Sequence, residues 1–290
     1  LENPDRVLIG GDDEKAIDAL SEIYSNWVPK NKILKTNIWS SELSKLTANA
    51  FLAQRISSIN SISALCESTG ADVNQVKKAI GMDTRIGEKF LSAGPGFGGS
   101  CFQKDILNLV YLSSFYKLDE VANYWQGVID INNWQKSRIS RLVVNYLFGN
   151  VSEKKIAILG FAFKANTNDT RQSPSINICK DLLEEGAHLS IFDPKVENLK
   201  ISDDLNNDLN KIKAIQGYGT WEIASSVLDS ANGSDAIILL TEWDEFLNID
   251  WNILIKMMRK PAWVFDTRSV VDDEAIKNIG LNIWKLGSNY

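Results

Sequence analysis

The C-terminal half of the chain alternates short apolar runs with stretches of helical period. Short segments that are rich in apolar residues, expected to be strands, occur at residues 156–160, 189–193, 236–241, 263–266 and 282–285. Helices are predicted between them at 174–185, 221–231 and 252–258. Strands that alternate with helices in this order form a parallel, doubly wound sheet, and ligands of such sheets bind at the carboxyl ends of the strands. The pattern therefore predicts an α/β domain of Rossmann-like architecture over residues 150–290.

The turn after the first of these strands lacks the glycines of a dinucleotide site. Such a site requires the pattern G-x-G-x-x-G, whereas this chain reads GFAFK at residues 160–164. We therefore interpret the domain as nucleotide-binding but not as a standard NAD site, with an NAD site at 160–193 as the alternative. Phe163 is suited to stack on a base, and Lys164 and Arg268 are suited to neutralise a phosphate. Asp193, which precedes a proline, is interpreted as a turn residue.

The first half of the chain is predicted to be mostly helical. Helices are expected at 40–65, at 72–81 and from 101 onward, with Ser40 or Ser41 as the N-cap of the first. A longer helical pattern runs from 118 to 149. At about 30 residues it is long enough to link domains or to pack against a partner subunit, although packing within its own domain is the alternative.

The opening segment is predicted to be a strand at 6–10, a helix at 13–27 and a second short strand at 33–36. So few elements do not bury both faces of a sheet, which suggests that they are the end of a larger unit. The chain begins at Leu1, and its first residues do not resemble a signal peptide. We therefore expect a fragment of a longer protein.

A glycine-rich stretch leads directly into a cysteine. Four glycines fall within residues 94–99, which allows a tight turn and a close approach to a ligand. A helical period begins at Cys101 and places Cys101, Lys104 and Asp105 on one face. The helix N-terminus and the lysine both favour a thiolate, so Cys101 is a candidate nucleophile and Asp105 a candidate to orient a water molecule. An ordinary turn with a buried thiol is the alternative.

Two further polar positions stand out in otherwise apolar surroundings. Lys45 and Asn49 are four residues apart on the predicted helix, so they share one face. They are either a solvated edge or a pair that points into a pocket, where Lys45 is suited to stabilise a developing negative charge on oxygen. Arg85 lies in a loop before the glycines, and its planar guanidinium suits a phosphate or hydroxyl ligand.

Composition excludes several classes of function. A net charge of −6 argues against nucleic acid or an anionic membrane as the main partner, and no apolar run approaches the roughly 18 residues of a membrane span. The three cysteines are irregularly spaced and His188 is the only histidine, so neither a disulfide framework, a metal site nor a histidine-based triad is expected. This cysteine usage is typical of a cytoplasmic protein.

Several motifs together resemble one protein family, the nucleotide-sugar dehydrogenases. The matching segments are SELSK at 41–45, ANAF at 48–51, AQRISSIN at 53–60, GPGFGGSCFQKD at 94–105, GFAFK at 160–164 and DTR at 169–171. The resemblance covers essentially the whole chain. Members that act on GDP-mannose or UDP-N-acetylmannosamine share the cysteine loop, but the helix with Lys45 is most similar to members that act on UDP-glucose.

The resemblance implies a four-electron oxidation of UDP-glucose to UDP-glucuronate with two molecules of NAD⁺. In that chemistry Cys101 attacks an aldehyde intermediate to give a thiohemiacetal, a second oxidation leaves a thioester, and water hydrolyses it. Lys45 then stabilises the oxyanion, and Asn49 and Asp105 position water.

The resemblance also implies binding residues. NAD contacts are expected from Cys101, Lys104 and Arg171, and Arg85 is expected to reach the site of a neighbouring subunit. Related proteins from animals often carry lysine where this chain has Ser92, so one phosphate contact is lost or replaced. The UDP-sugar contacts are expected from Lys45, Asn49, Arg85, Ser92, Gly94, Gly96, Phe97, Gly98, Phe163, Lys164 and Arg268.

The family pattern divides the chain into three parts. Residues 1–37 are expected to be the end of an N-terminal NAD-binding domain, 38–149 a helical dimerisation and catalytic domain, and 150–290 a UDP-sugar-binding domain. A homodimer, or a hexamer built from dimers, is expected. Because most of the NAD-binding domain is absent, we expect this chain alone to be inactive. A UDP-sugar-binding and dimerising module without catalysis is the alternative function.

Overall fold

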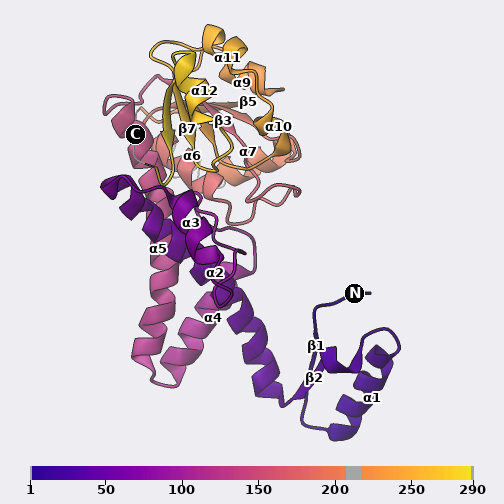
Figure 1. The fold of residues 1–290 in the computed structure, drawn as a ribbon. Coiled ribbons are helices and arrows are strands. Elements are labelled where there is room, and N and C mark those ends of the chain that lie inside the picture. The colour runs from indigo at the N-terminus through magenta and orange to yellow at the C-terminus, as the bar shows by residue number, and fades with distance from the viewer. Residues whose placement is uncertain (1, 207–216, 289–290) are drawn as a thin grey trace.

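The computed structural model describes residues 2–206 and 217–288, and these form three parts along the chain (Figure 1). The first is a small unit of two parallel strands, β1 (Val7–Gly10) and β2 (Ile33–Thr36), joined by α1 (Glu14–Ser25) and a short 3₁₀ turn (Lys30–Lys32). α1 buries none of its residues. The unit projects from the N-terminal end of the next helix, away from the C-terminal sheet (Figure 1).

The second part is helical. It comprises α2 (Ile38–Thr69), α3 (Val73–Gly81), α4 (Phe102–Phe115) and α5 (Asp119–Tyr146). Alanines on α2 let the helices approach closely, and the core that they share consists of Ala50, Ala53, Phe97, Ile106, Leu109, Val128 and Ile129.

Helix α2 begins earlier than the sequence predicted. Its N-cap is Asn37, whose side chain accepts a hydrogen bond from the backbone N–H of Ser40 at 2.8 Å. The prediction of Ser40 or Ser41 as N-cap is wrong, because an asparagine was available one turn earlier. Ser41 instead donates its hydroxyl to the carbonyl of Ile38 inside the helix at 3.0 Å.

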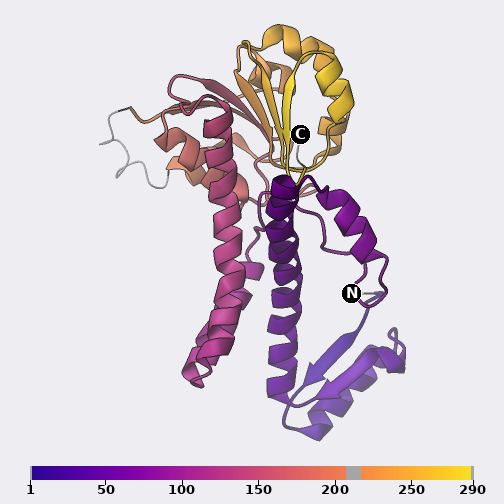
Figure 2. The same ribbon diagram turned by 60° about the vertical axis from the view of Figure 1, so that its left-hand side comes forward.

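Helix α5 joins the second and third parts. Its middle residues Val128 and Ile129 belong to the helical core, whereas Ile139 and Val143 belong to the core of the C-terminal sheet domain. With 28 residues at about 1.5 Å each, it spans about 42 Å. The long predicted helix therefore links two domains, as Figure 2 shows.

The third part is a six-stranded sheet in the order β5-β4-β3-β6-β7-β8, with every neighbouring pair parallel. The predicted α/β class with a doubly wound parallel sheet is confirmed. Helices lie on both faces of the sheet (Figure 2). The strands are β3 (Lys155–Leu159), β4 (His188–Phe192), β5 (Thr220–Ile223), β6 (Ala236–Leu239), β7 (Trp263–Asp266) and β8 (Asn282–Lys285). The helices are α6 (Pro174–Glu184), α7 (Asn198–Asn206), α9 (Val227–Ala231), α10 (Asp244–Leu247), α11 (Trp251–Met257) and α12 (Asp273–Asn278).

The helix predicted at 221–231 is wrong in its first part. Residues 220–223 form the edge strand β5, in which Trp221 lies opposite Leu189 and Ile223 opposite Ile191. The alternation of Trp221 and Ile223 with polar neighbours suits a half-buried edge strand, and a short stretch of this kind is ambiguous between strand and helix. The helix itself begins after Ser226, whose hydroxyl accepts from the N–H of Asp229 at 3.1 Å.

The strand order reverses between β3 and β6, which are neighbours in the sheet. In sheets of this kind a crevice opens at the carboxyl ends of the strands beside the reversal. Gly160, directly after β3, takes a positive φ of 97° and lies against Thr241, which is close after β6. Within the described ranges, no helix combines the length and apolar character that crossing a membrane requires.

We predict that Gly160→Ala destabilises the protein by at least ~2 kcal/mol, measured by urea unfolding. A β-carbon at this position would lie 2.4 Å from the Cβ of Thr241, in a backbone conformation that side chains disfavour. Gly149→Ala is the control, because Gly149 has φ 73° but open space around it, and it should lose only about 1 kcal/mol. Equal losses in the two variants would contradict the steric account.

Candidate active site

A cavity of about 330 Å³ lies between the glycine-rich loop and the strand ends of the C-terminal sheet. Cavities of this size hold small molecules. Eight of its lining residues are ones that the sequence predicted for the substrate: Ser92, Gly94, Gly96, Phe97, Gly98, Phe163, Lys164 and Arg268. The structure thus brings together the loop of the helical domain and the polar strand ends of the sheet domain.

Buried amide side chains hold the glycine-rich loop. Asn132 of α5 accepts from the N–H of Phe97 at 2.8 Å and donates to its carbonyl at 3.2 Å. Gln135, one turn further along α5, donates to the carbonyl of Gly94 at 2.9 Å, and Asn60 of α2 accepts from the N–H of Gly94 at 2.9 Å. Because these three amides are buried, each bond is made in surroundings where leaving it unmade is costly.

The glycines of this loop are required by neighbouring protein atoms. A β-carbon on Gly98 would lie 2.6 Å from the carbonyl oxygen of Gln172 and 2.8 Å from Cβ of Phe163. The N–H of Gly99 donates to the carbonyl of Arg171 at 2.7 Å. The glycines therefore allow the loop to pack against the segment after β3, which is how Phe163 reaches the cavity.

Arg268 is the most enclosed cation of the cavity, with its side chain 14% exposed. Its Nε donates to the carbonyl of Leu240 at 2.8 Å, and its guanidinium pairs with Glu242 at 3.1 Å. Burial lowers the pKa of Arg268, but an arginine stays charged at any physiological pH. Asp266, at the end of β7, shapes the turn by accepting from the N–H of Arg268 and of Val271, each at 2.9 Å. Burial raises the pKa of Asp266.

Cys101 lies at the start of α4, directly after the glycine-rich loop, and is exposed. The hydroxyl of Ser100 lies 3.6 Å from its Sγ. Cys66 and Cys179 are buried, and burial raises the pKa of both thiols. Of the three cysteines, Cys101 therefore has the accessibility that a nucleophile needs.

Asp105, one turn after Cys101, gathers the two polar residues of α2. Its carboxylate is 3% exposed, accepts from the amide of Asn49 at 2.6 Å and pairs with the ammonium of Lys45. The backbone N–H of Asp105 donates to the carbonyl of Cys101 at 2.9 Å. Cys101 therefore lies one helical turn before the cluster of Asp105, Lys45 and Asn49. Lys45 keeps 61% of its side chain exposed, which leaves its ammonium accessible to a ligand. The four residues predicted as catalytic therefore lie together.

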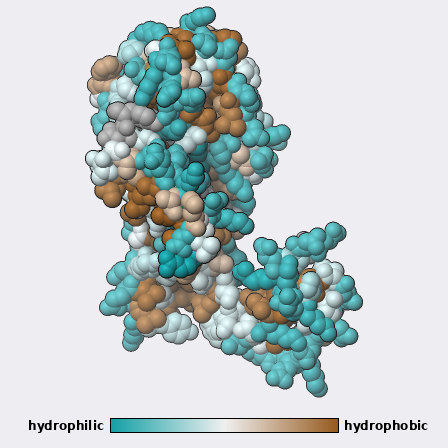
Figure 3. All heavy atoms as spheres, in the orientation of Figure 1, coloured by the Kyte–Doolittle hydropathy of each residue, from teal (hydrophilic) through white to brown (hydrophobic). Residues whose placement is uncertain are grey.

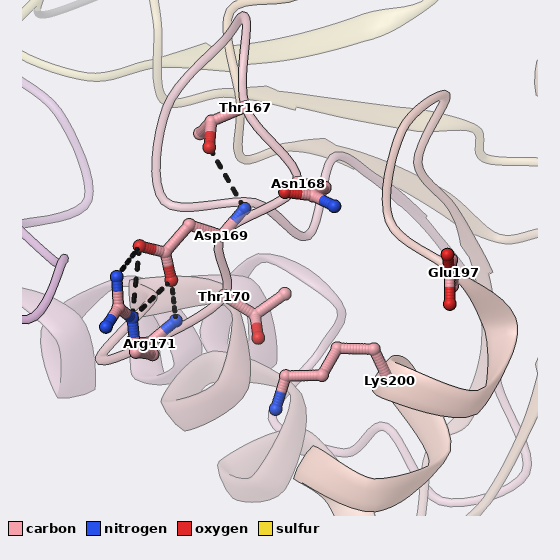
Figure 4. Close-up of a pocket in the computed structure, with 7 residues that line it drawn as sticks. All are labelled: Thr167, Asn168, Asp169, Thr170, Arg171, Glu197 and Lys200. Atoms are coloured by element: carbon pink, nitrogen blue, oxygen red, sulfur yellow. Dashed lines mark hydrogen bonds and ion pairs between the residues drawn. The ribbon is translucent and has the colours of Figure 1, made fainter.

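Arg171 lies on the loop between β3 and α6 and lines a second cavity of about 580 Å³ (Figure 4). Its guanidinium pairs with Asp169, with bonds of 2.9 and 2.7 Å, and remains 63% exposed. The hydrogen bond to Asp169 raises the pKa of Arg171. Lys104 is exposed on α4. Lys200 projects into the same cavity (Figure 4).

Arg85 is not part of either cavity. Its side chain is 87% exposed and forms two short bonds with Asp83, of 3.0 Å from Nε and 2.6 Å from the terminal nitrogen. This pairing raises the pKa of Arg85 and lowers that of Asp83. Within this single chain, Arg85 therefore does not meet the other predicted substrate residues.

The turn after β3 does not fit a dinucleotide. The carboxylate of Asp193 accepts from the N–H groups of Phe161 and Ala162, at 2.7 and 3.0 Å, and from the indole of Trp243 at 3.2 Å. Those amides are the ones that a pyrophosphate would use in a standard NAD site. The chain thus occupies its own anion site, and Asp193 also forms the predicted turn by accepting from the N–H of Lys195.

Four lining residues were not predicted from the sequence: Ile56, Phe90, Phe102 and Glu242. Glu242 follows β6 as Arg268 follows β7, so its place at a strand end was a usable signal. Phe90 and Phe102 flank the glycine-rich loop, and Phe102 packs edge-on against Phe97 with ring centroids 5.8 Å apart. Aromatic residues beside such a loop carry no pattern that separates a cavity wall from an ordinary core.

Two models of one protein family match the chain. The central domain of the UDP-glucose/GDP-mannose dehydrogenase family matches residues 39–134, and the UDP-binding domain of the same family matches residues 157–273. Together these matches include more than half of the chain. The chain belongs to the UDP-glucose/GDP-mannose dehydrogenase family, which confirms the predicted resemblance.

Within that family the chain is a homologue of UDP-glucose 6-dehydrogenases. It is 52% identical over 294 residues to the enzyme of Drosophila melanogaster, covering 100% of this chain and 62% of the relative. It is 55% identical over 294 residues to the enzyme of Bos taurus, covering 99% and 59%. The solved structure of a UDP-glucose dehydrogenase from the archaeon Pyrobaculum islandicum superposes with a TM-score of 0.81 at 27% identity, over 100% of this chain and 60% of that one. The chain spans about 60% of the length of these relatives.

Lys136 of α5 is a buried cation beside the glycine-rich loop. It is 3% exposed, and its carbon chain lies against Gly96 of the loop. In the part of the chain that is described, no carboxylate pairs with it. Burial lowers the pKa of Lys136 to about 8. The folded protein therefore disfavours the charged form, whereas the unfolded chain holds it at the ordinary lysine value near 10.4.

We predict that the free energy of unfolding rises between about pH 8 and pH 10 because of Lys136. Below pH 8 the folded state bears the full cost of a buried charge, about 3 kcal/mol from the size of the shift, and this cost disappears as Lys136 loses its proton. Lys136→Met should be more stable than the wild type at pH 7, with the difference shrinking towards pH 10. Urea unfolding at several pH values measures this. The exposed Lys256→Met is the control, and a constant difference across pH would contradict the prediction.

Proposed function

We propose that this chain supplies the nucleophile and the substrate site of an NAD-dependent enzyme that oxidises UDP-glucose to UDP-glucuronate. The observation that carries the proposal is the placement of Cys101. Its accessible thiol lies at the end of the loop that lines the cavity, and one turn from the cluster of Asp105, Lys45 and Asn49. The homology to UDP-glucose 6-dehydrogenases supports the choice of substrate over GDP-mannose or UDP-N-acetylmannosamine.

The cavity suits a nucleoside diphosphate sugar. Phe163 offers an aromatic face for the base, Lys164 offers positive charge for the diphosphate, and the guanidinium of Arg268 offers N–H donors. The glucose part then extends along the loop towards Cys101, because Gly98 lines the cavity and Cys101 follows three residues later. Orientation of the sugar carbon beside the thiol is the main contribution of this binding to catalysis.

The chemistry at Cys101 follows from its neighbours. The first oxidation converts the 6-hydroxyl to an aldehyde by loss of a hydride and a proton. The thiol of Cys101 gives up its proton to solvent and Sγ bonds to the aldehyde carbon. The carbonyl π electrons move to oxygen, and the ammonium of Lys45 stabilises the resulting negative charge. Loss of a second hydride from this carbon leaves a thioester. Water, oriented by Asp105 and Asn49, attacks the thioester carbon and the C–S bond breaks. One proton of the water returns to Sγ and the other goes to solvent, which leaves the carboxylate product and the restored thiol.

NAD⁺, when bound, supplies the acceptor for both hydrides. Lys104 follows Cys101 by three residues on α4, and the carbonyl of Arg171 accepts from Gly99 of the loop that leads to Cys101. Both are exposed cations that suit the phosphates of such a cofactor, whereas the turn after β3 does not because Asp193 fills it. We assign residues 1–37, whose helix buries none of its side chains, to an NAD-binding domain. Residues 38–149 are assigned to dimerisation and catalysis, and 150–290 to UDP-sugar binding.

We predict that UDP-glucose protects Cys101 from alkylation. Cys101 is the exposed thiol of the three, so iodoacetamide at neutral pH should modify it far faster than Cys66 or Cys179. Saturating UDP-glucose should slow that modification at least about tenfold, because the sugar covers the thiol. Peptide mass spectrometry measures the modification at each site.

The companion measurement is calorimetric titration with UDP-glucose, GDP-mannose and NAD⁺. Tighter binding of GDP-mannose would contradict the choice of substrate. Binding of UDP-glucose without any protection of Cys101 would favour the alternative of a binding and dimerising module, because the sugar would then lie away from the thiol.

The dimer that we propose uses the outer faces of the central helices. Large apolar or aromatic side chains there are exposed, among them Tyr111 at 67%, Phe115 at 66% and Tyr124 at 57%. Figure 3 shows hydrophobic side chains gathered near the turn between α4 and α5. Exposed apolar surface of this extent is typical of an interface. A neighbouring subunit would also give Arg85 a site to reach.

We predict that the double variant Tyr111→Asp/Phe115→Asp shifts the protein from dimer to monomer, measured by sedimentation velocity. Tyr111 and Phe115 stack on one face of α4 with ring centroids 6.4 Å apart, so two carboxylates there would be buried in the proposed interface. Leu199→Asp on α7, at a position 77% exposed, is the control and should leave the dimer intact. An unchanged dimer in the double variant would place the interface elsewhere.

A further inference from the structure

Lys77 of α3 directs its ammonium group at a residue of the cavity wall. Its Nζ donates a hydrogen bond to Oγ of Ser92 at 2.8 Å, and Ser92 lines the cavity. Helix α3 contributes no lining residue of its own. Within residues 2–206 and 217–288, Ser92 is the partner found for Lys77, and no carboxylate neutralises it. The charge is therefore available to the cavity.

The cavity wall offers less positive charge than the two negative charges of a diphosphate require. Arg268 and Glu242 already pair with each other at 3.1 Å. Lys164 is then the remaining cation of the wall, with its Nζ 5.6 Å from the Phe163 ring centroid. A nucleoside diphosphate sugar carries one negative charge on each of its two phosphates. A second uncompensated cation close to the wall would complete the balance.

We propose that Lys77 and Ser92 form a phosphate-binding pair for the nucleotide-sugar site, an inference that rests on the proposed function. Ser92 donates its hydroxyl hydrogen to a diphosphate oxygen. Nζ of Lys77, on helix α3, donates to the oxygen of the same hydroxyl. Since the hydroxyl accepts from Lys77, its own hydrogen is free to point into the cavity. Lys77 thus orients this donor and adds positive charge beside the phosphates, so it is a positioning residue for binding.

The backbone that carries Lys77 is anchored to the sheet domain. Asp72, the N-cap of α3, accepts from the N–H of Gln75 at 2.9 Å and from the hydroxyl of Ser288 at 2.8 Å. The N–H of Val73 donates to the carbonyl of Gly287 at 2.9 Å. Both contacts lie just after β8, so α3 is held on the domain that also provides Arg268. Such anchoring reduces the ordering cost when the pair engages a ligand.

The test compares the affinities of variants for UDP-glucose, UDP and uridine by calorimetry and competition. Lys77→Met should weaken UDP-glucose and UDP about tenfold and leave uridine unchanged, because uridine has no phosphate. The loss should shrink at high salt, since the lysine acts through its charge. Lys77→Arg, which keeps the charge, should retain most of the affinity. Lys78→Met, the adjacent and exposed lysine of α3, is the matched control.

A second variant tests the pair by moving the positive charge from position 77 to position 92. In Lys77→Met/Ser92→Lys the ammonium moves from α3 to the loop beside the cavity, so the affinity for UDP-glucose should recover from that of Lys77→Met. Unchanged binding by Lys77→Met, or an equal loss for uridine, would overturn the proposed pair while leaving the proposed function intact. Failure of the double variant to recover would also overturn it. Wild-type protein that binds neither UDP-glucose nor UDP would overturn both.

Discussion

The hydrogen bonds between α5 and the glycine-rich loop are the interaction on which the site depends. Asn132 satisfies both backbone groups of Phe97, and Gln135 donates to the carbonyl of Gly94, three residues earlier in the loop. A loop with so many glycines has much conformational entropy to lose, and these buried amides compensate for it. Once the loop is held, its end sets where α4 begins, and with it the positions of Cys101 and Asp105.

The sequence predicted those parts of the fold whose pattern is local and repeated. The alternation of apolar strands and helices after residue 155 indicated the parallel sheet, and the helical period around residue 130 indicated α5. It failed at 220–223, where four residues fit either period and only the pairing of Trp221 with Leu189 decides for a strand. It also misplaced the N-cap of α2, because Asn37 and the two serines are all good caps.

The candidate site was predictable where residue type and position together carried chemistry. Cys101 after a glycine loop, and Arg268 after a strand, are informative for that reason. Pairings across the chain were not predictable: the sequence does not show that Asp105 accepts from both Lys45 and Asn49, or that Asp193 fills the turn after β3. These contacts depend on the packing of distant elements, which no local pattern encodes. Phe90 and Phe102 were missed for the same reason.

Helix α5 contributes residues to two hydrophobic cores, and it sets both the distance and the relative rotation of the two domains. Ile129 belongs to the core around the glycine-rich loop and Ile139 to the core of the sheet, with a continuous helix between them. The number of residues in that interval therefore sets the rotation of one domain relative to the other. One inserted or deleted residue would turn the domains by about 100° and carry the loop away from the strand ends. Surface loops elsewhere tolerate changes of length. The length of α5 between Ile129 and Ile139 must be kept, because it aligns the two domains that together form the cavity.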